Sequence, residues 1–193
     1  MDDAVVRALA KWPDVPDVFG WLRLDKRGQW RLKDEIVRHV GLINFLGRNY
    51  ESDTHQRWFV QNGPQRVYVA LDYTPWVFKL GASSQFETHT GLTLDTLITA
   101  MLDDEGQMLI ESEHGIGVVT DRDLPTLLDA VWKADGSRAS EAELLALMQG
   151  DDGQLVFRWG NIKLPLTAMR ASEVPLRYRF VTNPAPTEPA PSA

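Results

Sequence analysis

The sequence predicts an α+β protein made mainly of antiparallel hairpins that pack with a few short helices. Residues 57–80 carry the clearest evidence, because apolar and polar residues alternate on both sides of Asn62-Gly63 and a further apolar run follows Pro75. Asn and Gly tolerate positive φ, so this pattern is typical of a hairpin. The stretch therefore predicts three strands joined by two turns.

Two further observations support the same fold class. Residues 155–166 alternate around Gly160-Asn161, which predicts a second hairpin. Ser140 and Glu143 form a capping box ahead of an apolar stretch that ends at Gly150. This spacing predicts a helix over residues 141–149.

The other elements follow in chain order. Apolar spacing predicts a helix over residues 3–10, stopped by Pro13 and Pro16, and a second helix that begins at the N-cap Asp34 and ends near residues 47–49. Threonines at 93, 96 and 99 favour strands over a helix in residues 92–102. The sequence further predicts strands at 20–24, 29–32, 108–110 and 116–119, a helix over 124–132, and a last strand through Tyr178 and Phe180.

Composition limits the class of protein. The chain has 193 residues, 44% hydrophobic residues and seven tryptophans, which suits one or two folded domains. It has no cysteine, which excludes disulfides, zinc–thiolate sites, iron–sulfur clusters and thiol catalysis. No apolar run reaches the ~18 residues of a membrane span, and the N-terminus lacks the order of a signal peptide. We expect a bacterial-type cytoplasmic protein with no membrane association.

Charge is unevenly spread along the chain. Residues 20–80 hold ten Lys/Arg against six Asp/Glu, a net charge of +4. Residues 81–152 hold three against fifteen, a net charge of −12. The asymmetry indicates either two electrostatic lobes, with a basic one that meets an anionic ligand, or a solvated acidic surface.

An acid-Gly-Gln step recurs at three predicted strand starts. It occurs at Asp25 to Gln29, at Asp103 to Gln107 and at Asp152 to Gln154. Type I turns favour Asp at the first position and Gly at the last, so turn chemistry alone explains the spacing. The alternative is an internal duplication.

Several of these residues resemble a known family. Three segments are similar to motifs of a bacterial domain-of-unknown-function family. They are Asp25-x-x-Gly28-x-Trp30, Asp53 followed by residues 57–60, and the predicted strand 66–72 with Pro75. The resemblance covers residues 20–80 best. It implies two related α+β lobes, the C-terminal one superficially pleckstrin-homology-like, and a small, nucleotide-like ligand bound between them in signalling. Residues 61–65 depart from the family pattern.

These patterns predict two lobes flanked by an N-terminal arm and a C-terminal tail. Residues 1–19 are expected to form an N-terminal helical arm, and residues 20–80 an N-terminal α+β lobe. Residues 81–182 are expected to form a β-rich C-terminal lobe with helices. The Pro/Ala-rich tail 183–193 is expected to be disordered.

The sequence offers few residues for catalysis or metal binding. The histidines stand at 39, 55, 89 and 114, without the i, i+4 spacing of a metal pair on one helix, and the acidic residues of 103–123 lack the order of a calcium loop. The chain has no G-x-S-x-G elbow, no phosphate-binding loop and no dinucleotide fingerprint. We expect no bound metal and no cofactor.

The remaining candidate is an aromatic and basic face on the predicted sheet. Arginines interleaved with aromatic residues can clamp an anion or stack on a ring, although the same alternation also arises when the tryptophans are core. A pI near 5.1 argues against nucleic acid. The candidate ligand-binding residues are Arg57, Trp58, Gln61, Arg66, Tyr68 and Trp76.

The sequence therefore predicts a cytoplasmic, non-catalytic ligand-binding or regulatory module that binds a small anionic, nucleotide-like ligand at the lobe interface. One alternative is a scaffold for a protein partner, with the Pro-rich tail as a docking segment. The other is an enzyme that uses His55, His89 or His114 with an acidic partner.

Overall fold

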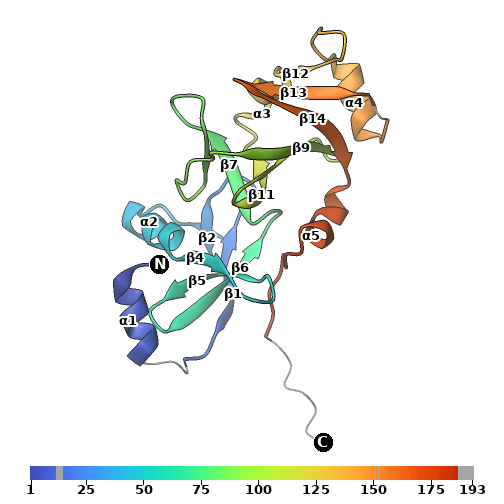
Figure 1. Ribbon diagram of the computed structural model, residues 1–193. Coiled ribbons are helices and arrows are strands. Elements are labelled where there is room, and N and C mark those ends of the chain that lie inside the picture. The colour runs from blue at the N-terminus through green and yellow to red at the C-terminus, as the bar shows by residue number, and fades with distance from the viewer. Residues whose placement is uncertain (12–14, 152, 187–193) are drawn as a thin grey trace, which may run out of the picture. The chain divides into compact units, whose positions relative to one another are not determined.

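The computed structural model describes residues 1–11, 15–151 and 153–186 (Figure 1). These residues form two compact units. The first contains Met1–Asp25, Gln29–Asp72 and the described residues from Phe180 onward, and the second contains Lys26–Gly28 and Tyr73–Arg179. Each unit has its own β-sheet and short helices. The predicted α+β fold with two lobes is confirmed.

The first unit contains a six-stranded sheet with the strand order β3-β2-β1-β6-β5-β4. Neighbouring strands are antiparallel except for β1 and β6, which are parallel. Its core includes the fully buried Trp30 and Tyr68. The elements are α1 (Asp3–Lys11), β1 (Val18–Leu24), β2 (Trp30–Leu32), β3 (Glu35–Ile36), α2 (Val40–Arg48), β4 (Tyr50–Ser52), β5 (Trp58–Asn62) and β6 (Gln65–Leu71).

The second unit contains an eight-stranded sheet with the order β12-β13-β14-β9-β10-β11-β7-β8. Only β7–β11 and β9–β14 are parallel among the described pairs of this sheet. The elements are β7 (Trp76–Leu80), β8 (Phe86–Thr88), β9 (Leu97–Asp103), β10 (Met108–Ser112), β11 (Gly115–Val119), α3 (Leu124–Leu128), β12 (Val131–Trp132), α4 (Glu141–Met148), β13 (Leu155–Trp159), β14 (Ile162–Met169), the 3₁₀ turn η1 (Ala171–Glu173) and α5 (Val174–Arg177).

Local sequence chemistry explains the elements that were predicted well. The β5–β6 hairpin turns at Gly63, whose φ of 58° suits glycine. The capping box of α4 is complete, since the Ser140 hydroxyl accepts from the Glu143 amide and the Glu143 carboxylate accepts from the Ser140 amide. The β13–β14 hairpin pairs Trp159 with Ile162 across its turn.

The predicted end of the first lobe at residue 80 is wrong. β7 pairs with β11 and β8, so Trp76–Leu80 belongs to the larger sheet and the first unit ends at Asp72. The apolar pattern of residues 57–80 is interrupted only by its two turns, and it contains no signal for the sheet that each strand joins. The partner strand β11 lies about forty residues further along the chain, which only tertiary pairing reveals.

The helix predicted from Asp34 begins later than expected. Lys33 and Asp34 have φ values of 45° and 69°, and this left-handed turn folds Glu35–Ile36 back onto β2 as β3. α2 begins at Val40 instead, with His39 as its N-cap because its Nδ1 accepts from the Leu42 amide. Apolar spacing alone did not separate the short strand from the helix.

Three predictions in the second half also need correction. The helix over 124–132 stops at Leu128, because Val131 pairs with Phe157 as part of β12. In 92–102, only residues from Leu97 onward form a strand. The last strand through Tyr178 and Phe180 is wrong: the short helix α5 runs from Val174 to Arg177 with Pro175 in its first turn, and an isolated bridge joins Arg57 to Val181.

Aspartates close several hairpin turns in the same way. Asp25 Oδ1 accepts from the Gln29 amide at 2.8 Å, and Asp103 Oδ1 accepts from the Gln107 amide at 2.7 Å. Both turns place glycine at positive φ one residue before that amide. Turn chemistry accounts for the Asp and the Gly at these two sites, an internal duplication stays a prediction, and Asp152 of the third step lies outside the described residues.

The predicted disordered tail lies mostly outside the described part of the chain: residues 187–193 are not described, and 184–186 form neither helix nor strand. Across the described residues, no helix has both the length and the apolar character to cross a membrane.

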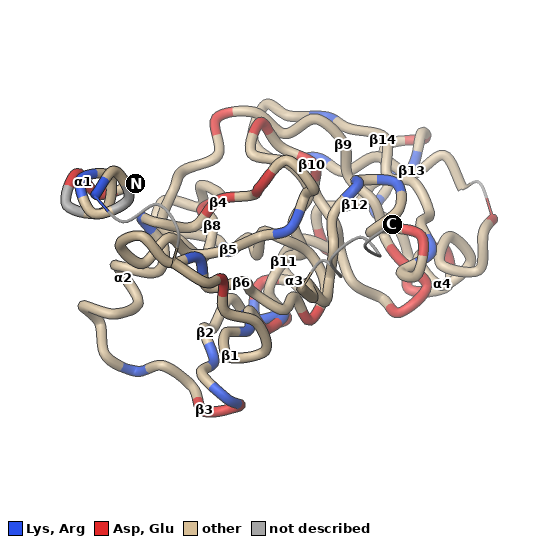
Figure 2. Tube along the Cα trace, turned by 90° about the horizontal axis from the view of Figure 1, so that it is seen from below, with Lys and Arg blue, Asp and Glu red and all other residues tan. Residues whose placement is uncertain are grey.

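Basic and acidic positions are interspersed along the trace of the second unit (Figure 2).

Candidate functional site

The six predicted ligand-binding residues fall into both units. Five of them lie in the first unit, on β5 and β6 or directly before β5, whereas Trp76 lies on β7 of the second unit. Their binding of one shared ligand stays a prediction. The contacts of each group within its own unit show what these side chains already do.

Arg57 belongs to a closed cluster with Asp53 and Tyr68. The Arg57 guanidinium donates to Asp53 Oδ2 at 2.8 Å and to Tyr68 Oη at 3.0 Å, and Tyr68 Oη donates to the same carboxylate at 3.0 Å. The Asp53 and Arg57 side chains are only 6% and 16% exposed. Burial alone would raise the pKa of Asp53, but hydrogen bonds from Arg57 and Tyr68 outweigh it and lower this pKa. Arg57 is therefore a structural ion-pair partner.

The other first-unit residues have comparable packing roles. The Gln61 side chain is buried and donates to the Gly63 carbonyl at 2.9 Å, which stabilises the β5–β6 turn. The Trp58 ring lies 4.7 Å from Tyr50, and the Arg66 guanidinium lies 4.8 Å from the Phe59 ring centre. These contacts support the reading of the aromatic alternation as core packing.

Trp76 brings two of the histidines together. Its ring lies 5.7 Å from His89 and 5.8 Å from His114. Burial lowers the pKa of His89 to about 3, and Lys79 contributes in the same direction, so this imidazole is neutral at pH 7. His39 and His55 lie in the first unit. The described residues contain no group of three or more side chains that could hold a metal ion.

The second unit contains a small cavity lined by cations, which we call the cationic pocket. Its volume is about 200 Å³ and its lining residues are Arg27, Lys79, Thr120, Asp121 and Arg122. They come from three segments: the turn at 26–28, strand β7 and the loop after β11. The Arg27–Asp121 pair at 2.7 Å is well exposed, at 67% and 56% of the two side chains.

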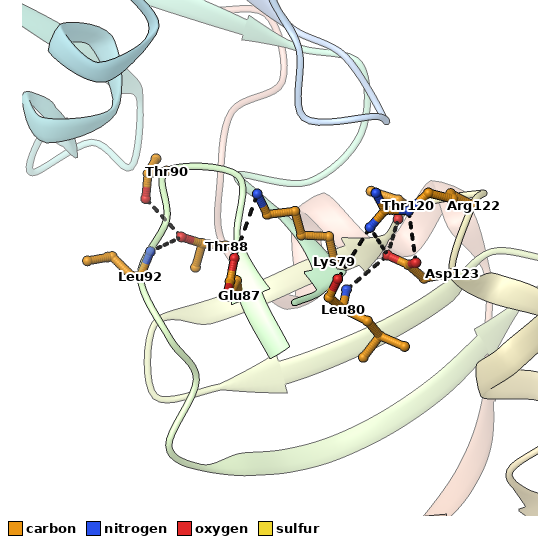
Figure 3. Close-up of polar contacts among 9 residues, drawn as sticks. All are labelled: Lys79, Leu80, Glu87, Thr88, Thr90, Leu92, Thr120, Arg122 and Asp123. Atoms are coloured by element: carbon orange, nitrogen blue, oxygen red, sulfur yellow. Dashed lines mark hydrogen bonds and ion pairs between the residues drawn. The ribbon is translucent and has the colours of Figure 1, made fainter. Parts of the chain in front are cut away.

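The loop after β11 is held to β7 by Asp123 (Figure 3). Asp123 Oδ2 accepts from the Thr120 hydroxyl at 2.8 Å, from the Leu80 amide at 2.9 Å and from Arg122 at 3.0 Å. Burial would raise the pKa of Asp123, but these hydrogen bonds prevail and lower it. These hydrogen bonds tie the loop after β11 to the backbone of Leu80, directly after Lys79.

Arg27, Thr120 and Arg122 are not among the ligand-binding residues predicted from the sequence. The signal that could have found them is the Thr-Asp-Arg-Asp sequence directly after a predicted strand, where an Asp can cap the following turn. Arg27 carries no such signal, because a turn arginine is ordinary. Its place beside residues almost a hundred positions away is a tertiary result.

Comparisons with known proteins describe a family and a fold. The model of a family described as "Protein of unknown function (DUF2946)" matches residues 1–185. A solved DUF1285 family protein from Silicibacter pomeroyi DSS-3 has a TM-score of 0.52 at 12% identity, covering 80% of this chain and 84% of its own. Another, from Shewanella baltica OS155, has a TM-score of 0.41 at 11% identity, covering 55% and 88%. Among the curated proteins, none matches.

Proposed function

This chain belongs to the family described as protein of unknown function (DUF2946), and because membership brings no activity with it, we propose a function from the second unit: the protein binds a small anion in the cationic pocket. The observation that carries this proposal is the convergence of Arg27, Lys79 and Arg122 on one cavity. We also propose that the protein is cytoplasmic and that its role is regulatory.

The size of the pocket favours one anionic group. Pockets for drug-sized ligands begin at ~300 Å³, and the cationic pocket has about 200 Å³. A phosphate or carboxylate group fits this space, and the rest of a larger ligand such as a nucleotide would lie outside it.

The existing ion pairs do not prevent binding. The Arg27–Asp121 pair is exposed, and such pairs contribute only ~0–1 kcal/mol, so an incoming anion replaces Asp121 at little cost. Arginine carries five N–H donors and binds phosphate in a bidentate way. Arg122 is also 67% exposed while it is paired with Asp123. Lys79 is paired with Glu87 at 3.7 Å, and these two side chains are 41% and 36% exposed, so this pair also lies at the surface, where ion pairs contribute little.

The chemistry of the lining favours binding over catalysis. A general base works best with a pKa near the working pH, whereas the pKa of Asp123 next to the pocket is lowered. The lining contains arginine, lysine, threonine and aspartate, and no histidine is among these described residues. These groups hold a charge rather than transfer a proton.

A urea-unfolding series with inorganic phosphate tests the proposal. Unfolding is measured at constant ionic strength with chloride or phosphate, for the wild type, Arg27→Gln, Lys79→Gln and the matched control Lys163→Gln on the exposed side of β14. At 100 times its Kd, phosphate stabilises a single-site protein by about 2.7 kcal/mol. We expect the wild type and Lys163→Gln to be stabilised and the two pocket variants to lose most of the effect. Equal stabilisation of all four proteins, or of none, would contradict the proposal. Repeating the series with AMP separates a nucleotide from free phosphate.

A further inference from the structure

A larger cavity in the second unit lies where strands far apart in the sheet order meet. It has a volume of about 610 Å³ and lies between the 83–86 segment, the 94–97 segment and the β13–β14 turn. β8 ends the sheet order, and four strands separate it from β14. Nevertheless the Trp159 indole donates to the Ser84 carbonyl at 2.9 Å, and its ring lies 5.8 Å from Phe86. We call this cavity the hairpin groove.

The floor of the hairpin groove is an extension of the hydrophobic core. Phe86, Leu94 and Leu97 line it and are 3%, 5% and 8% exposed. Trp159 and Ile162 are cross-strand partners, so they lie on one face of the hairpin and form an apolar wall. The Trp159 ring is nearly parallel to that of the buried Phe157, with 8° between their planes. A flat apolar ring could therefore pack against Trp159 over a dry floor.

The rim of the groove is polar and carries negative charge. Asp95 is the one charged residue among the described lining residues. The other polar lining side chains carry hydroxyl or amide groups. The neighbouring Glu113 carboxylate accepts from the Asp95 amide at 2.6 Å and from the Thr96 amide at 3.1 Å. Burial would raise the pKa of Glu113, but these backbone hydrogen bonds lower it, so it is ionised at pH 7. Asp95 is therefore the carboxylate that lines the groove, and Glu113 holds the backbone of the Asp95 segment in place.

We propose that the hairpin groove binds a small amphipathic molecule with a flat apolar ring and a protonated amine. The ring packs against Trp159 and Ile162, and the amine faces Asp95. Ligand pockets span ~300–1,000 Å³ and combine an apolar lining with a few polar groups, which agrees with the volume of about 610 Å³ and with these residues. This site and its ligand charge are distinct from those of the cationic pocket.

Two probes of opposite charge test the proposal in solution. 2-Phenylethylamine and 3-phenylpropanoate share a phenyl ring and are titrated into ¹⁵N-labelled full-length protein. The indole N–H resonance of Trp159 is assigned from its loss in Trp159→Phe, whose remaining spectrum shows that the fold is kept. We expect the amine to shift this resonance and to bind about tenfold more tightly than the carboxylate, as one short charge contact allows.

Asp95→Asn separates charge recognition from apolar packing. In this variant we expect both probes to shift the Trp159 resonance with similar Kd, whereas the exposed control Asp129→Asn keeps the preference for the amine. The proposal is overturned if the carboxylate binds wild type as tightly as the amine. It is also overturned if Asp95→Asn keeps the full preference, or if neither probe shifts the Trp159 resonance at millimolar concentration.

Discussion

Two arginine–aspartate pairs, one in each unit, differ in exposure rather than in chemistry. Arg57 and Asp53 lie 2.8 Å apart and are 16% and 6% exposed, while Arg27 and Asp121 lie 2.7 Å apart and are 67% and 56% exposed. In the first pair, the Tyr68 hydroxyl hydrogen-bonds to both side chains, and the cluster stabilises the folded first unit. The second borders the cationic pocket and faces solvent. The comparison indicates that burial, rather than residue type, sets how much an arginine–aspartate pair contributes to stability.

Removal of the buried carboxylate should have the largest effect. Asp53→Ala leaves Arg57 without its carboxylate in a largely buried site, and breaking such a pair costs about 3–5 kcal/mol of unfolding free energy. Urea denaturation at pH 7 measures the loss. Asp121→Ala is the matched control, and a loss in Asp53→Ala no greater than in this control would contradict the comparison.

The pH dependence of stability should separate the two units. The pKa of His89 in the folded protein is about 3, below its ordinary 6.5. The unfolded chain therefore binds the extra proton, and the stability contributed by neutral His89 is complete above pH 6.5 and lost as the pH falls towards 3. Titration of one such group changes the unfolding free energy by at most about 1.4 kcal/mol per pH unit. The lowered pKa of Asp53 changes the stability only as the pH falls below 3.8, the ordinary pKa of this group.

Unfolding free energies at pH 7, 6, 5 and 4 for wild type and His89→Gln provide the measurement. Asp103, whose pKa burial raises, acts in the opposite direction because its protonation favours the folded state. It is present in both proteins, so their difference isolates His89. We expect the wild type to lose stability relative to His89→Gln as the pH falls. Parallel curves would show that His89 does not titrate in this window.

Loss of a single hydroxyl from the closed cluster should have a moderate effect. Tyr68→Phe removes the group that donates to Asp53 and accepts from Arg57. A buried hydrogen bond contributes about 1 kcal/mol, which urea denaturation resolves. Tyr178→Phe, whose hydroxyl contacts Glu111 at 3.4 Å, is the control and should lose less. Equal losses would mean that the cluster adds nothing beyond a peripheral contact.

The smallest effect on stability is expected at the exposed pair. Asp121→Asn should change the unfolding free energy by less than ~0.5 kcal/mol, because the pair is exposed. The same variant should bind phosphate several-fold more tightly, since Arg27 loses its competing carboxylate. Calorimetric titration measures this affinity, and weaker phosphate binding than in the wild type would argue against the cationic pocket.

Short-range chemistry in the sequence predicts much of the fold. The hairpin at Asn62-Gly63, the capping box at Ser140 and the turns closed by Asp25 and Asp103 all depend on contacts within a few residues. Each is recognisable because backbone conformation at a turn or a helix start requires particular side chains there. These local patterns predict the α+β class, and the lack of cysteine excludes thiol-based sites.

Tertiary structure decided the sheet assignment and the surroundings of each charge. β7 follows β6 after a short turn and has a similar apolar composition, yet it pairs with β11 in the larger sheet. In the sequence, Arg57 and Arg27 are both basic residues next to predicted turns. In the folded protein, Arg57 is largely buried beside Tyr68, whereas Arg27 lines a cavity. The physical reason is that partners from distant segments set pairing and desolvation, and neither leaves a local pattern in the sequence.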